Sequence, residues 1–332
     1  RELAEDYAFR FGRPEEINDQ MESRIGEYGV GMKRSLFKLG KSFTIESNPV
    51  EEYRFLIEID VDEWESHDSW NFDAEIIYQT DPRCKLEEPG TRIEITELHE
   101  ECKNEFQDEI FISKLKNKLV SRFNQYLQRD FQIILNKDPL GYTSIDMLQS
   151  DDIEPAYRDF TIEAEGAKID VDIRAGVGES DPDRAGWYVF CNGRLVLEAD
   201  QSPVTGWTGE PIPKFHGQFN RFRGVVNFKS DDPGALPWNT TKTDVNSDSM
   251  VFQNTRQKMI SEMRPIVDFL NNIRSQQREM DLDSEDSTPL EQKVESASTI
   301  DANEVESDED KSFSSPEPGE VEEEEEEGGT TN

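Results

Sequence analysis

The sequence predicts an α+β protein with two folded regions and a disordered acidic tail. Four stretches between residues 42 and 98 alternate apolar and polar residues with a period of two, which is typical of β-strands. A helical pattern follows over residues 108–127, and a second strand-rich region ends in another helical pattern at residues 249–273. With 332 residues, the chain is also long enough for more than one hydrophobic core.

The first region is expected to form an antiparallel sheet with one covering helix. β-Branched and aromatic residues alternate with polar ones between Asn, Pro and Gly breaks, which predicts strands at residues 42–47, 53–61, 72–80 and 91–98. The helix at residues 108–127 is expected to cover this sheet with an apolar face. That face consists of Ile112, Leu115, Leu119, Phe123 and Leu127.

The second region repeats this combination of strands and a helix. Its strands are expected at residues 131–136, 159–166, 168–176, 186–197 and 222–230. Asn192, Gly193 and Arg194 form a hairpin turn within the fourth of them. The helix at residues 249–273 closes the region, which gives each half of the protein two layers.

The C-terminal segment has a different composition. Residues 276–332 contain 21 acids and 3 bases, and a run of glutamates lies near their end. Few large apolar side chains are available to offset the loss of chain entropy, so we expect disorder. The segment serves either as a solubilising tail or as an acidic arm for a basic partner or for self-inhibition. The predicted domains are therefore residues 1–128, 129–275 and 276–332.

Cysteine content and hydropathy favour a cytoplasmic protein. Cys84, Cys102 and Cys191 are too few and too scattered for a disulfide framework. No apolar run approaches the roughly 20 residues of a membrane span. The chain starts at Arg1 inside a helix-like pattern, so we expect further residues upstream.

One stretch departs from the acidic character of the chain. Acids outnumber bases 73 to 36, which argues against a general nucleic-acid-binding surface. Residues 29–43 nevertheless carry four basic residues and no acid, and a helix is expected at residues 32–40 with Met32, Leu36 and Leu39 along one face. The preceding glycines form a turn that directs free helix N–H groups toward one point, where phosphate is the natural ligand.

This stretch, IGEYGVGMKRSLFKLG at residues 25–40, resembles the ATP-lid glycine box of the GHKL ATPases. That superfamily includes gyrase, the ninety-kilodalton heat-shock chaperone, histidine kinases and MutL. A lysine directly after the third glycine makes this stretch most similar to the microrchidia (MORC) branch and to bacterial ATP-binding relatives. The resemblance implies a partial Bergerat-type ATP-binding sheet followed by a transducer-like domain. It also implies lid contacts to ATP from Gly26, Tyr28, Gly29, Val30, Gly31, Met32 and Lys33.

Two later motifs are similar to parts of the same superfamily. GTRIEI, residues 90–95, resembles the strand whose Thr hydroxyl supports the adenine pocket, which implies that role for Thr91. GALPWNTTKTDV, residues 234–245, resembles the transducer loop whose lysine reaches the γ-phosphate, which implies a binding and catalytic role for Lys242. Without the resemblance, Gly90 and Thr91 indicate only a turn that leads into a strand, and Lys242 is interpreted as a solvated loop residue.

The resemblance also implies parts that this sequence does not show. GHKL catalysis uses a Glu that activates water and an Asn that holds magnesium on one early helix, then an Asp-x-Gly-x-Gly turn that binds adenine. None of these occurs before residue 24, and residues 2–14 resemble the helix that follows the turn. We therefore expect ATP and Mg²⁺ as cofactors, with the Mg²⁺ ligand upstream and no metal site in residues 1–332. Because the general base and the adenine anchor are among these parts, residues 1–332 alone are expected to show no ATP turnover above background.

A second acid-free stretch, residues 212–229, bears on partners. Strand alternation sends Arg221 and Arg223 to the face opposite Phe222. This is either a basic face for phosphate, nucleic acid or a protein partner, or a solvated face whose arginines pair with the chain's own acids. The resemblance implies a homodimer that closes on ATP binding, with no membrane involved. The alternative is a non-catalytic interaction scaffold that uses the fold, this basic face and the acidic tail.

Overall fold

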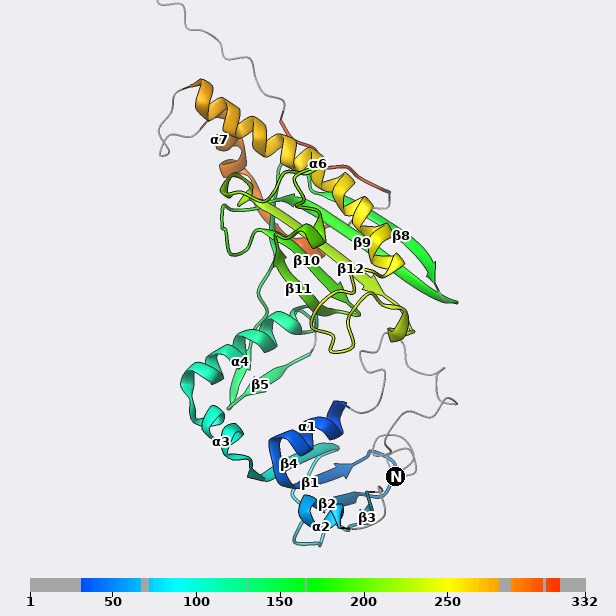
Figure 1. The fold of residues 1–332 in the computed structure, drawn as a ribbon. Helices are drawn as coiled ribbons and strands as arrows, with labels where there is room; N and C mark the ends of the chain where they lie inside the picture. Colours follow the sequence, from blue (N-terminus) through cyan, green and yellow to red (C-terminus); the bar gives the residue numbers. More distant parts are fainter. Residues whose placement is uncertain are drawn as a thin grey trace, which may run out of the picture. The chain divides into compact units, whose positions relative to one another are not determined.

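The computed structural model describes residues 31–66, 72–129, 131–164, 166–280, 288–306 and 309–316. The chain divides into two compact units, unit 1 with residues 1–119 and unit 2 with residues 120–332 (Figure 1). Both units combine helices with β-sheets, which confirms the α+β prediction at this level. The division falls after Leu119 rather than after residue 128, and the residues from 276 onward belong to unit 2.

Unit 1 is built on an antiparallel four-stranded sheet in the order β3-β2-β1-β4. Each of the four predicted stretches overlaps a strand, although the third strand is only two residues long. The elements are α1 (Gly31–Leu39), β1 (Gly40–Asn48), β2 (Phe55–Asp60), α2 (Val61–Glu65), β3 (Glu75–Ile76), β4 (Gly90–Leu98), α3 (Glu100–Gln107) and α4 (Glu109–Arg122), which continues into unit 2.

The core of unit 1 lies between this sheet and the helices α1 and α2. Leu36 of α1 is buried together with Phe43 and Ile45 of β1 and with residues of β2. Aromatic rings extend this core, because the rings of Trp64 and Phe72 stack with their centres 5.5 Å apart. The sheet and α1 therefore form one packed body.

The predicted helix at residues 108–127 differs from the structure in extent and in contacts. α4 ends at Arg122, and the short helix α5 (Asn124–Leu127) follows. No side chain of α4 is buried, and Leu127 is the one buried member of the predicted apolar face, so the prediction of a helix that covers the first sheet is wrong. The chain passes into unit 2 here, where Arg122 donates a hydrogen bond of 2.6 Å to the carbonyl of Leu195.

Unit 2 is built on a five-stranded sheet in the order β11-β10-β12-β9-β8, in which β10 and β12 are parallel and the other pairs antiparallel. Two-stranded pairs β5–β6 and β7–β13 accompany it. The strands and α-helices after α5 are β5 (Ile133–Leu135), β6 (Asp138–Leu140), β7 (Asp146–Gln149), β8 (Ala156–Ala164), β9 (Ala167–Val177), β10 (Gly186–Cys191), β11 (Arg194–Asp200), β12 (Phe222–Lys229), α6 (Met250–Glu279), α7 (Pro289–Ser296) and β13 (Ser298–Asp301). Short 3₁₀ turns lie at Pro203–Thr205, Gly217–Phe219, Pro233–Ala235 and Ala302–Glu304.

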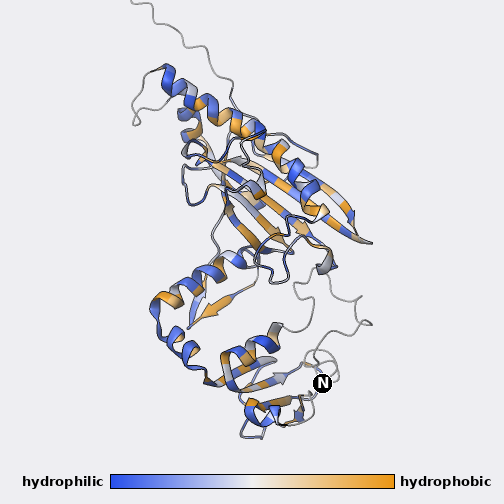
Figure 2. Ribbon diagram, viewed as in Figure 1, coloured by the Kyte–Doolittle hydropathy of each residue, from blue (hydrophilic) through white to orange (hydrophobic). Residues whose placement is uncertain are grey.

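Both faces of the five-stranded sheet are covered. The long helix α6 lies across β8, β9 and β12 (Figure 1), and hydrophobic residues recur along it between hydrophilic ones (Figure 2). On the opposite face, Tyr188, Phe190 and Val225 form a buried cluster with residues from β7 and from the turn after β13. Every β12 residue from Phe222 to Phe228 is consequently buried.

This burial corrects the prediction of a basic strand face at Arg221 and Arg223. The side chain of Arg223 is 1 % exposed, and its guanidinium donates to the carbonyls of Asn220, Phe222 and Glu179. Alternation of side chains along a strand places one set in solvent only when one face of the sheet is exposed to solvent. β12 is a central strand of a sheet that is covered on both faces, so both sets of its side chains are buried. Arg221 precedes β12 and is half-buried.

The prediction of disorder from residue 276 is wrong for the part of that segment that the structure describes. α6 continues to Glu279, a capping box of Thr288 and Glu291 starts α7, and β13 pairs with β7. The few apolar residues are placed where they can be buried, among them Leu290, Val294 and Phe313. Composition averaged over 57 residues hides such spacing. Residues 281–287 and 317–332 lie outside the described ranges.

Candidate functional site

The predicted lid is described from Gly31 onward, where α1 begins. Gly31 and Met32 are exposed, and a Cβ atom at Gly31 would meet nothing within 4 Å. The first turn of a helix carries N–H groups without intrahelical partners, so this end of α1 can approach an anion closely. The remaining predicted lid residues, Gly26, Tyr28, Gly29 and Val30, lie outside the described residues.

Lys33 is buried, in contrast to the predicted orientation of the helix. Its side chain is 1 % exposed, and burial lowers the pKa of its ammonium group. The sequence predicted Met32, Leu36 and Leu39 as the packed face, but the buried residues of α1 are Lys33 and Leu36. A phosphate therefore reaches Lys33 only if this ammonium becomes accessible.

Thr91 lies at the start of β4, opposite Ser47 of β1, and it is exposed. α1 joins β1 directly, and its C-terminal end is held at the other end of β4, where the N–H of His99 donates to the carbonyl of Leu39 over 3.0 Å. The N-terminus of α1 therefore points back along the sheet toward the end that carries Thr91 (Figure 1). The predicted phosphate and adenine contacts of unit 1 thus belong to one packed body.

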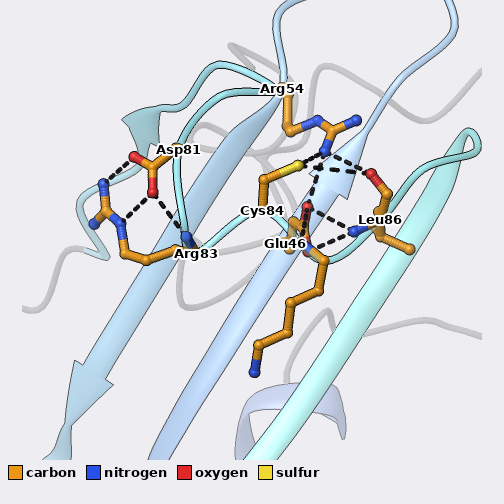
Figure 3. A network of polar contacts seen from close by, with 7 residues as sticks. Glu46, Arg54, Asp81, Arg83, Cys84 and Leu86 are labelled. Carbon is orange, nitrogen blue, oxygen red and sulfur yellow. Dashed lines mark hydrogen bonds and ion pairs between the residues drawn. The ribbon is translucent and has the colours of Figure 1, made fainter.

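A buried polar network holds the segment before β4 (Figure 3). Glu46 of β1 is 2 % exposed, and its carboxylate accepts hydrogen bonds of 3.0–3.1 Å from the backbone N–H groups of Lys85 and Leu86. Arg54 donates to Glu46 over 3.2 Å and to the carbonyl of Leu86 over 2.6 Å, and it also contacts the thiol of Cys84. The network fixes the path by which the chain reaches Thr91, and sequence reasoning did not identify it.

Asp81 and Arg83 form a second, more exposed part of the same loop (Figure 3). Arg83 donates to Asp81 from its backbone N–H, from Nε and from Nη2 over 2.8–3.0 Å. Chiefly through the side-chain bonds, Arg83 lowers the pKa of the Asp81 carboxyl from 3.8 to about 2. The resulting stabilisation is complete above pH 3.8 and is lost as the pH falls through about 2.

We expect this pKa to be directly measurable. In a carboxyl-detected NMR titration, Asp81 should titrate near pH 2 in the native protein. In Arg83→Gln the midpoint should rise toward 3.8, because the guanidinium that favours the charged carboxylate is removed. A Lys41→Gln variant serves as the control, since Lys41 pairs with Asp62 and should leave Asp81 unchanged. A normal midpoint for Asp81 in the native protein would contradict the geometry of this loop.

Lys242 lies in a tight turn of unit 2. Its φ is +56°, in the left-handed region that residues other than glycine rarely adopt. Its N–H donates to the carbonyl of Asn239 over 2.9 Å, and the Asn239 side-chain oxygen accepts 3.0 Å bonds from the Thr241 hydroxyl and the Thr243 N–H. The Lys242 ammonium lies 4.1 Å from the centre of the Trp238 ring, within the range of a cation–π interaction. The turn is therefore ordered, with the lysine at its strained position.

Arg194 connects this turn to the sheet, a role that its hairpin-turn context did not reveal. Its Nε donates to the Lys242 carbonyl over 3.1 Å, and its guanidinium lies 5.8 Å from the centre of the Phe123 ring. Burial, and next the charge of Arg122, lower the pKa of Arg194. Among the described residues, no carboxylate pairs with Arg122 or Arg194. Positive charge therefore accumulates beside Lys242.

Comparison with known proteins adds no relative. A scan against models of protein families gives no match, and a search of curated proteins finds no significant similarity. Over the ranges that the structure describes, no three His, Cys, Asp or Glu side chains are grouped to hold a metal ion. In those same ranges, no helix combines the length and the apolar surface needed to cross a membrane.

Proposed function

We propose that this chain is part of a cytoplasmic GHKL-type ATP-binding protein, in which the lid of unit 1 and Lys242 of unit 2 make contacts that control a conformational switch. The Lys242 turn supports this most directly. Lys242 is one of six described non-glycine residues at positive φ, a conformation that costs about 1–3 kcal/mol and is common at ligand-binding sites, and it is the one that lies in the predicted phosphate loop. Arg194 and Arg122 add positive charge beside the turn, which favours a polyphosphate.

Each unit contributes a different part of nucleotide recognition in this proposal. The N-terminus of α1 and Lys33 bind phosphate oxygens, and the Thr91 hydroxyl supports the adenine pocket. Lys242 is a compact point charge suited to a terminal phosphate. Bound ATP supplies a γ-phosphate that ADP lacks, so Lys242 distinguishes the two nucleotides. The Mg²⁺ ligand is expected upstream, and the switch acts in a homodimer as a gate.

Replacement of Lys242 tests the proposal. In the full-length gene product, Lys242→Met should weaken ATP binding by roughly tenfold or more, because a charge-assisted hydrogen bond contributes about 1.5–3 kcal/mol. ADP affinity should stay nearly unchanged, since ADP offers nothing to this turn. A ligand shifts a conformational equilibrium only through contacts that differ between states, so ATP-dependent protection of the turn from protease should also disappear. Calorimetry with both nucleotides and limited proteolysis measure these effects.

A matched control is available in the same unit. Lys258 of α6 also lies over an aromatic ring, 4.6 Å from the centre of Phe160, so Lys258→Met removes the same kind of interaction without touching the turn. It should leave both nucleotides unaffected. Lys33→Met should weaken ATP and ADP together, with adenosine unaffected. If Lys242→Met weakens both nucleotides equally, or neither, Lys242 does not sense the γ-phosphate.

A further inference from the structure

Unit 2 contains a pocket that the proposed nucleotide contacts do not use. It has a volume of about 350 Å³ and lies between the second half of α6, the β9–β10 loop and the turn before β12. Ser180, His216 and Arg221 line it from the loops, and Leu270, Ile273 and Arg274 line it from α6. The volume lies in the range of small-molecule sites.

Two arginines in this pocket have hydrogen-bonding capacity that the protein does not use. Arg221 makes one long bond of 3.4 Å, to the carbonyl of Gly178, and Arg274 makes one bond of 2.9 Å, to the side chain of Gln277 in its own helix. Each guanidinium has five N–H donors. No carboxylate in the described part of the chain pairs with either one, although acids outnumber bases twofold in the sequence.

Other arginines of unit 2 show the contrast. Arg158 pairs with Glu262 over 2.6 Å and with Asp310 over 3.3 Å, and Arg174 pairs with Asp172. Arg221 and Arg274 make no such pair in the described part of the chain, and both line the same pocket. Their charge is therefore available to an anionic ligand.

The acid that lines the pocket is already engaged. Glu291 accepts a 3.0 Å hydrogen bond from Gln277 and a 3.4 Å bond from the backbone N–H of Thr288, as part of the capping box of α7. These bonds orient its carboxylate toward the α7 N-terminus. With two arginines against this one carboxylate, the described lining of the pocket still has a net positive charge.

The walls of the pocket are tied together without a ligand. The buried Arg223 bonds to the carbonyls of Glu179 and Asn220, which joins the β9–β10 loop to the turn before β12. Gln218 of that turn donates to the Asn271 side chain of α6 over 2.8 Å. A preformed site requires little ordering when a ligand binds, which favours affinity.

We infer that this pocket binds the phosphate group of a small organic phosphate ester. The planar guanidinium forks of Arg221 and Arg274 match phosphate oxygens, and Ser180 adds a hydroxyl to the pocket lining. Leu270 and Ile273 provide an apolar wall for the organic part of the molecule. A doubly charged phosphate complements two arginines better than a single carboxylate does.

This pocket is separate from the Lys242 turn. It lies beside the first residues of β10 and β12, whereas Lys242 contacts Arg194, which follows the end of β10. The six residues of β10 span about 20 Å at roughly 3.3 Å per residue. The two sites can therefore be tested independently, and the failure of one leaves the other standing.

Binding of phenyl phosphate to residues 1–332 tests the inference, with calorimetry at constant ionic strength. Saturable binding is expected, and Arg221→Gln and Arg274→Gln should each weaken it at least tenfold. Arg278→Gln is the control, because Arg278 lies on the same helix, is exposed and does not line the pocket. The affinity of the Arg278→Gln variant for phenyl phosphate should match that of the native protein. The midpoint of thermal unfolding should be the same for all three variants.

Two further probes define the ligand. Benzoate should bind at least tenfold more weakly than phenyl phosphate, and inorganic phosphate should also bind more weakly because it lacks the apolar part. Equal affinity for inorganic phosphate and phenyl phosphate would overturn the assignment to an organic ester. Absence of saturable binding, or an equal loss in Arg278→Gln, would overturn the pocket as a phosphate site.

Discussion

Replacing Glu46 with alanine is expected to destabilise unit 1 by about 3–5 kcal/mol, because it leaves a buried charge without its partner. The Arg54 side chain is only 9 % exposed, and Glu46 is the carboxylate that it contacts. The backbone N–H groups of Lys85 and Leu86 lose their acceptor in the same step. Buried donors without partners cost the free energy of their desolvation, so the losses accumulate. Urea unfolding measures the change in the free energy of unfolding.

Glu58→Ala is the matched control for this substitution. Glu58 lies in the same sheet and also pairs with an arginine, Arg83 at 2.9 Å, but its side chain is 51 % exposed. Such surface pairs contribute at most about 1 kcal/mol. Loosening of the loop should also expose the thiol of Cys84, so peptide-level labelling should accelerate in Glu46→Ala alone. Equal effects of the two substitutions on stability and labelling would show that the buried network adds nothing to an ordinary surface pair.

Strands were predictable where their pattern is local. β1, β2 and β4 alternate because side chains of successive residues point to opposite faces, and one face of that sheet packs on α1. The same rule misplaced Arg223, because nothing within β12 indicates that α6 covers one face and a second cluster the other. Likewise, the average composition of the C-terminal segment did not reveal that its few apolar residues, such as Leu290 and Val294, are buried.

The candidate site shows the same division between local and distant information. Glycines, Lys33 and Lys242 could be proposed because each lies in a short motif that can be recognised by its own residues. Glu46 meets Leu86, which is 40 residues away, and Arg194 meets Lys242 over 48 residues. No short pattern encodes such contacts, which depend on how strands pair. The rotation of α1 that buries Lys33 also depends on packing against β1 rather than on the helical pattern alone.

Gly224→Ala is expected to destabilise unit 2 by about 3 kcal/mol, at the upper end of what overpacking a core costs. Gly224 lies on the central strand β12, directly opposite Trp187 of β10. A Cβ atom at Gly224 would lie 2.3–2.6 Å from three ring carbons of Trp187. The indole cannot move away easily, because it is fully buried and packs against Phe222 with ring centres 5.3 Å apart. Thermal unfolding and near-ultraviolet circular dichroism measure the loss.

Two comparisons isolate the clash with Trp187 from the general effect of adding a methyl group. Gly141→Ala should be nearly neutral, because a Cβ there meets nothing within 4 Å. Trp187→Leu should relieve the crowding, so the double variant with Gly224→Ala should lose less stability than the sum of the single losses. The Gly224→Ala substitution should also disturb the proposed nucleotide site. The pairing of β10 with β12 positions Arg194, which follows β10 and donates to the Lys242 carbonyl. If the losses of stability from Gly224→Ala and Trp187→Leu are additive in the double variant, a clash with the indole is not the reason why glycine is required at position 224.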